Sequence, residues 1–148
     1  MAAQTPSYSG GCHCGGVRYV FSTDSAPAQW PVRRCTCSFC IRLGARYTSG
    51  PGARLEVTVQ HASMAASYEF GTQTAEFFRC NRCGVMLFAT CKLDNQRFAV
   101  ININTLDDVE QLSLNTVDVD FNGEHVENRL ERRRRNWIGD VSVRYVNA

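Results

Sequence analysis

Short runs of apolar and β-branched residues, separated by glycine, asparagine and aspartate, recur along the chain and predict a mainly β protein. The clearest run is residues 55–59, Leu-Glu-Val-Thr-Val, where apolar and polar positions alternate as on a half-buried strand. Because the chain shows neither an internal repeat nor a long linker, we expect a single domain over residues 1–148. Similar runs predict further strands at residues 17–21, 30–34, 67–70, 75–79, 85–89, 98–103 and 117–121.

Two segments carry helical rather than strand signals. Residues 105–112 begin with Thr105, which can cap a helix, and the following turn is acidic, as suits a helix N-terminus. Residues 126–136 form a basic segment with helix-forming composition. The fold is therefore expected to add one or two short helices to its strands.

The composition limits the classes of protein that the chain can represent. A length of 148 residues is enough to bury one sizeable core, and a net charge of +2 is too small to indicate nucleic-acid binding by itself. We find neither a secretory signal nor the run of about 20 apolar residues that a membrane span needs. We therefore expect a soluble, cytoplasmic protein without a membrane or nucleic-acid partner.

One local charge cluster stands out against this balanced composition. Five arginines gather near the C-terminus, and Glu127 and Glu131 lie among them as local counter-charges. We interpret this run as a solvated helix face, while the alternative is a contact for phosphates or carboxylates. The five residues are Arg129, Arg132, Arg133, Arg134 and Arg135.

Seven of the eight cysteines fall into three tight groups with the spacing of metal ligands. Without a secretory signal, such spacing favours metal thiolates over disulfides and indicates a reducing compartment. The groups are a C-x-C pair (Cys12 and Cys14), a C-x-C-x-x-C triplet (Cys35, Cys37 and Cys40) and a C-x-x-C pair (Cys80 and Cys83).

The two pairs together supply four sulfur atoms, the number that a closed structural zinc site requires. Glycines surround the first pair and Gly84 follows the second, so both backbones can turn tightly around a metal. A shared zinc would tie the N-terminal segment to a point more than sixty positions later. We call Cys12, Cys14, Cys80 and Cys83 the cysteine quartet and expect it to hold a structural zinc ion.

Cys35, Cys37 and Cys40, here called the cysteine triplet, then remain as three ligands, and three protein ligands plus one exchangeable position are typical of catalytic zinc. Three thiolates and one Zn²⁺ ion together carry a net charge near −1. A zinc ion there would be a weak Lewis acid, but it would lower the pKa of a bound thiol and leave its sulfur able to attack carbon. In the alternative, Cys91 or His13 supplies a fourth ligand and closes the site.

Residues around the triplet also have two interpretations. Arg34, Arg42 and Arg46 are close to it in sequence and could hold a substrate carboxylate, although solvated surface positions are favoured for each. The aromatic residues between the last two cysteine groups and just beyond them are interpreted as core rather than pocket lining. These are Tyr68, Phe70, Phe77, Phe78 and Phe88.

Four motifs resemble the glutathione-dependent formaldehyde-activating enzyme family, which includes centromere protein V. They are residues 11–19 (Gly-Cys-His-Cys-Gly-Gly-Val-Arg-Tyr), 35–40 (Cys-Thr-Cys-Ser-Phe-Cys), 68–72 (Tyr-Glu-Phe-Gly-Thr) and 78–85 (Phe-Arg-Cys-Asn-Arg-Cys-Gly-Val). The resemblance covers about residues 10–112 and leaves 113–148 as a C-terminal extension. It implies a zinc-binding, β-tent-like fold of short antiparallel sheets with two zinc ions, one at the quartet and one at the triplet.

The resemblance further implies a carbon–sulfur lyase that condenses glutathione with formaldehyde to S-hydroxymethylglutathione. In this interpretation a small thiol occupies the open position of the zinc held by Cys35, Cys37 and Cys40, which become the catalytic residues, and its sulfur attacks the aldehyde. The competing hypothesis is a non-catalytic, zinc-stabilised module that binds nucleic acid or protein through the arginine run.

Overall fold

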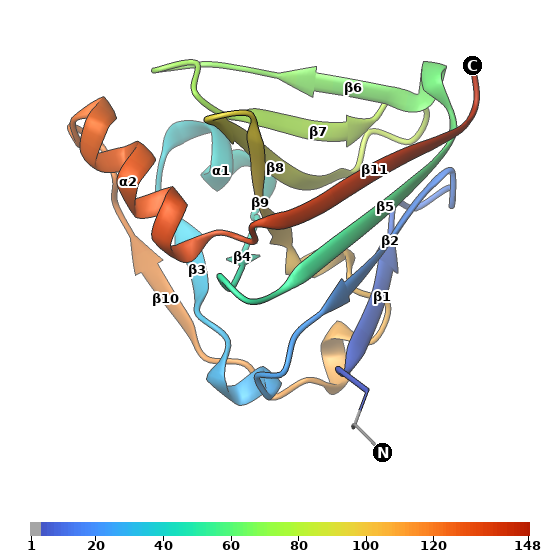
Figure 1. Cartoon of the computed structure of the whole chain (residues 1–148), viewed down its shortest axis with the longest axis horizontal. Coiled ribbons are helices and arrows are strands. Elements are labelled where there is room, and N and C mark those ends of the chain that lie inside the picture. Colours follow the sequence, from blue (N-terminus) through green and yellow to red (C-terminus); the bar gives the residue numbers. More distant parts are fainter. Residues whose placement is uncertain (1–3) are drawn as a thin grey trace.

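The computed structural model describes residues 4–148, which form two β-sheets and two α-helices and confirm the mainly β prediction (Figure 1). The first sheet has the strand order β1-β2-β5-β11. Its strands are β1 (Ser7–Gly11), β2 (Val17–Ser22), β5 (Arg54–His61) and β11 (Asp140–Asn147).

The second sheet has the order β10-β3-β4-β9-β8-β7-β6. Neighbouring strands in both sheets are antiparallel except for β10 beside β3 and β11 beside β5, which are parallel pairs at the sheet edges. The seven strands are β3 (Val32–Cys35), β4 (Tyr47–Thr48), β6 (Ala65–Tyr68), β7 (Glu76–Cys80), β8 (Met86–Leu93), β9 (Gln96–Asn102) and β10 (Thr116–Val119).

The two helices are α1 (Ser38–Leu43) and α2 (Val126–Asn136), the second with the bounds expected from the sequence. Among residues 4–148, no helix is long and apolar enough to cross a membrane. Short 3-10 turns complete the regular structure, at η1 (Pro27–Gln29), η2 (Ala62–Met64), η3 (Ile103–Thr105) and η4 (Val109–Gln111).

The main core lies between the two sheets. Alternate residues of β5, Leu55, Val57 and Val59, are fully buried, as the alternation in the sequence predicted. Across from them the second sheet contributes Phe88 and Ile101, which face each other on β8 and β9. Burial of these apolar side chains is the main term that holds the sheets together.

The opposite face of the second sheet carries a smaller apolar cluster, in which Ala89 and Val100 pack with Trp137 just after α2. Strand β8 is therefore buried on both faces, with six consecutive buried residues from Met86 to Cys91. This explains why β8 and β9 read as continuous apolar runs instead of alternating ones. The same face bears the candidate site. Helices α1 and α2 lie beside it (Figure 1).

The predicted helix at residues 105–112 is wrong, because the segment forms the turns η3 and η4. Thr105 does not cap an α-helix. Its hydroxyl donates to the carbonyl oxygen of Asn102 at 2.6 Å and lies 2.7 Å from the Tyr19 hydroxyl, while Leu106 forms a bridge with Gly10 of β1. The contacts with Tyr19 and Gly10, on strands distant in sequence, outweigh the local helical signal.

Candidate metal centres and pocket

The structure brings the cysteine quartet together at one end of the two sheets. All four sulfur atoms lie within 4.8 Å of one another, with Cys12 Sγ 3.6 Å from Cys14 Sγ and Cys14 Sγ 3.7 Å from Cys80 Sγ. A tetrahedron with Zn–S bonds of about 2.3 Å has edges of about 3.8 Å, so these separations suit a zinc ion and are too long for a disulfide. The quartet could therefore hold a metal ion.

Two similar turns present the quartet's sulfurs. In the first, between β1 and β2, Gly15 has a positive φ of 82° and Val17 N donates to Cys12 Sγ at 3.3 Å. In the second, between β7 and β8, Gly84 has a positive φ of 84° and its backbone N donates to the Cys80 carbonyl at 2.8 Å. A residue with a Cβ would be strained at either glycine, which accounts for their places in the sequence motif.

The cysteine triplet sits where β3 passes into α1. Cys35 ends β3, Cys37 precedes the first turn of α1 and accepts from the backbone N of Cys40 at 3.4 Å, and Cys40 lies inside the helix. Thr36 ties this segment to the end of β10, because both its backbone N and its hydroxyl donate to the Val119 carbonyl oxygen. All three sulfurs lie within 4.8 Å of one another, so the triplet could also hold a metal ion.

Hydrogen bonds within the triplet shift the pKa values of two of its thiols in opposite directions. Hydrogen bonding from the Cys40 thiol lowers the pKa of Cys35 to about 6, against the opposing effect of burial. The same hydrogen bond, together with burial, raises the pKa of Cys40 well above its ordinary value. The buried hydroxyl of Tyr47 lies 3.3 Å from Cys40 Sγ, within hydrogen-bonding distance of that sulfur.

No fourth cysteine, histidine or carboxylate joins the triplet in the part of the chain that the structure describes. Cys91 is buried on β8, where its sulfur accepts from Arg133 at 3.6 Å. His13 is exposed in the turn between β1 and β2 that belongs to the quartet. Neither of the two alternative ligands thus closes the triplet, which keeps one side free for an exogenous ligand.

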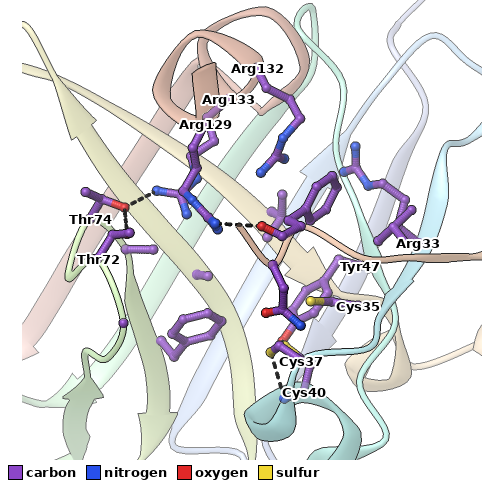
Figure 2. A pocket seen from close by; sticks show the side chains of 18 of the residues that line it. Arg33, Cys35, Cys37, Cys40, Tyr47, Thr72, Thr74, Arg129, Arg132 and Arg133 are labelled. Atoms are coloured by element: carbon purple, nitrogen blue, oxygen red, sulfur yellow. Dashed lines mark hydrogen bonds between the residues drawn. The ribbon is translucent and has the colours of Figure 1, made fainter. Parts of the chain in front are cut away.

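The free side of the triplet opens into a cavity of about 220 Å³. Figure 2 shows the three cysteines and Tyr47 at one end of this pocket and a group of arginines at the other. Apolar side chains, among them Phe70, Phe77 and Trp137, line the space between them. The pocket therefore combines the cysteine triplet, an apolar wall and a cationic wall. The cationic wall consists of Arg33, Arg129, Arg132 and Arg133.

The cationic wall corrects the interpretation of the C-terminal arginine run as a solvated face. Arg133 is buried at 6% exposure, and the side chains of Arg129 and Arg132 are 18% and 17% exposed, all three lining the pocket. Of the five arginines in the run, Arg134 and Arg135 are the two that are exposed. The run is therefore divided between the pocket and the exposed face of α2.

Arg33 of this wall was not predicted from the sequence, where its neighbour Arg34 was the candidate. Residues two apart share a face of a strand, so Arg33 points the same way as Cys35, while Arg34 points outward and pairs with Asp118. Arg42 and Arg46 also lie outside the pocket lining. Strand parity was the signal that could have identified Arg33.

The interpretation of the aromatic residues as core holds for only part of the set. Phe78 and Phe88 stack in the main core with ring centroids 4.5 Å apart. Phe70 and Phe77 line the pocket instead, and both pack against Phe39 of α1, with centroids 5.0 and 4.9 Å from its ring. These aromatic contacts hold α1, and with it the triplet, against the second sheet.

The fold and the site together define a class: a cysteine-rich, mainly β protein with two candidate metal centres, one of which opens into a pocket. The model of the glutathione-dependent formaldehyde-activating enzyme family matches residues 7–119, which is most of the chain. The chain therefore belongs to this family. Helix α2 and strand β11 lie beyond the matched residues.

A crystal structure of a Rhodobacter sphaeroides protein is similar to this chain, with 26% sequence identity and a TM-score of 0.49. The similarity covers 74% of this chain and 99% of that protein's chain.

Proposed function

We propose that the protein is a zinc-dependent carbon–sulfur lyase that joins a small thiol, such as glutathione, to an aldehyde, such as formaldehyde. One observation carries the proposal: in a chain of this family, three cysteine sulfurs face a pocket, and no fourth protein ligand joins them among residues 4–148. Cys35, Cys37 and Cys40 are proposed as ligands of the catalytic zinc and the quartet as the structural site. Eight free cysteines suit the reducing conditions of the cytoplasm.

The donor set supports zinc at both centres, since thiolates select soft or borderline metals and reject magnesium and calcium. Zinc held by the triplet would supply an open coordination position and a lowered pKa for a thiol bound there. In the reaction, a bond forms between the substrate sulfur and the carbonyl carbon, and the π electron pair moves to the oxygen, which takes up a proton. The thiol loses its proton, so no oxidant or reductant is needed.

The protein's own side chains prepare the site for this addition. The Tyr47 hydroxyl holds Cys40, and the interlocking rings of Phe39, Phe70 and Phe77 fix α1. The apolar wall limits water around the reacting atoms, and the arginines favour an anionic substrate. Positioning and exclusion of water are thus the contributions that we assign to the chain itself.

The proposal is tested by following the exchange of ¹³C-formaldehyde into its glutathione adduct by NMR, with zinc-loaded protein and with buffer alone. We expect exchange faster than the uncatalysed reaction, abolished by Cys37→Ser and retained in Arg135→Gln, which changes an exposed residue of α2. Exchange at the buffer rate with two zinc ions bound per chain would overturn the proposed function.

A further inference from the structure

Arg133 is a buried cation that pairs with no carboxylate in the described part of the chain. Its guanidinium donates to the hydroxyl of Thr74 at 2.8 Å and to Cys91 Sγ at 3.6 Å, and lies over the Trp137 ring at 4.9 Å. Within residues 4–148, no carboxylate oxygen lies within the 4.0 Å of an ion pair, and the Arg133 Nε has no hydrogen-bond partner. A buried charge left in this state is costly, so an anion from outside the chain is expected to complete it.

The neighbouring arginines strengthen this excess of positive charge. Arg129 and Arg132 share one carboxylate, that of Glu124, at 3.9 and 3.0 Å, and the Arg33 guanidinium donates to the neutral Ser49 hydroxyl at 2.7 Å. Burial lowers the pKa of Arg133. Even if the metal-loaded triplet carries a charge near −1, it and Glu124 cannot balance the four guanidinium groups.

We propose that Arg133 and the adjoining arginines of the pocket form the subsite that binds a carboxylate of the thiol substrate and so select among thiols. The planar guanidinium can donate two parallel hydrogen bonds to a carboxylate, and its position at the far end of the pocket suits a ligand whose sulfur lies at the triplet (Figure 2). A cavity of about 220 Å³ suits a small ligand or one arm of a larger one. This specificity rests on the proposed function, and α2, which provides Arg133, lies outside residues 7–119 matched by the family.

Calorimetric binding to the zinc-loaded full chain tests the subsite with four probes: 3-mercaptopropionate, the neutral thiol 2-mercaptoethanol, propionate and inorganic phosphate. We expect 3-mercaptopropionate to bind at least about tenfold more tightly than 2-mercaptoethanol, the difference typical of hydrogen bonds to a charged group. Arg133→Gln should remove this preference and the binding of propionate while leaving 2-mercaptoethanol binding unchanged. Arg135→Gln, an exposed neighbour on α2, should behave as wild type.

Equal binding of the two thiols by the wild type would overturn the subsite, as would phosphate binding more tightly than propionate. If propionate binds through Arg133 but neither thiol binds, the subsite stands and the proposed function fails. Circular dichroism and zinc content identify a variant that has not folded. If Arg133→Gln does not fold, Arg129→Gln is tested in its place, because this variant keeps the buried Arg133. Arg129→Gln should lower 3-mercaptopropionate binding more than 2-mercaptoethanol binding.

Discussion

Tyr47 shows how a single contact supports the triplet. Its hydroxyl lies 3.3 Å from Cys40 Sγ, and hydrogen bonds of this kind to a metal ligand commonly change metal affinity by about 10- to 100-fold. Tyr47→Phe should therefore weaken zinc binding at the triplet by about that factor while leaving the quartet unchanged. Competition with a chromophoric chelator measures the zinc affinities of both sites. An unchanged zinc affinity at the triplet would show that Tyr47 only fills space.

Glu124 is the carboxylate that pairs with Arg129 and Arg132 of the cationic wall. Arg132 donates to it at 3.1 and 3.0 Å, and this pairing holds the pKa of Glu124 below its ordinary value. A lowered folded pKa stabilises the protein above the unfolded pKa of about 4.3, and this stability is lost as the pH falls through the folded pKa. Glu124→Gln should therefore lower the free energy of unfolding at pH 7 by about 1 kcal/mol, with a smaller difference below about pH 4.

Urea unfolding at pH 7 and pH 3 measures this effect. Glu127→Gln on the exposed face of α2 is the matched control and should change little at either pH. A Glu124→Gln effect of the same size at both pH values would show that the carboxylate's charge does not matter.

At the residue scale, the sequence predicted the cysteine groups because ligand spacing is local, and the structure brings both predicted sets together. The position of Cys91 could not be predicted, because a single cysteine forms no ligand spacing with another. The structure shows it buried on β8, which pairs with β9. The burial of the arginines in the cationic wall was not predicted for a similar reason. Charge in sequence does not reveal which face of α2 a tertiary contact buries.

At the element scale, the junction between α2 and β11 joins the pocket wall to the first sheet. Ile138 is fully buried there, and its backbone exchanges hydrogen bonds of 2.9 and 3.0 Å with Ala99 of β9. Ile138→Ala should lower the free energy of unfolding by about 2–5 kcal/mol through lost burial and a cavity. Val146→Ala at an exposed position of β11 is the control, with a change of about 0.5 kcal/mol or less. Denaturant unfolding compares the two, and equal effects would show that the junction is not a packed part of the core.

Most strands could be predicted because their apolar runs were bounded by turn residues, yet β1, β4 and β11 were missed. β1 lies in a polar leader, and β4 has two residues. β11 has the alternation of a strand, with Val141 and Val143 half-buried, but its parallel pairing with β5 is a contact between residues about 86 positions apart. Such pairing is set by the whole fold and has no local signal.

At the scale of the whole molecule, the quartet links the two sheets. Cys12 and Cys14 come from the turn between β1 and β2 of the first sheet. Cys80 ends β7 of the second sheet, and Cys83 lies in the turn that leads to β8. Cys80→Ser should therefore lower the thermal stability of the entire protein, whereas Cys37→Ser should leave the fold intact and remove one bound zinc. Thermal unfolding combined with metal analysis separates the two effects, and equal destabilisation would contradict the division into a structural and an open centre.

Binding of a substrate sulfur at the triplet is tested most directly with cobalt(II) in place of zinc. The sulfur-to-cobalt charge-transfer absorption grows with the number of thiolates bound, so it reports a new sulfur ligand. Titration of the two-cobalt protein with glutathione should increase this absorption, and Cys37→Ser, which breaks the triplet, should abolish the increase. An unchanged spectrum at saturating glutathione, with both centres occupied, would contradict an open thiol-binding centre at Cys35, Cys37 and Cys40.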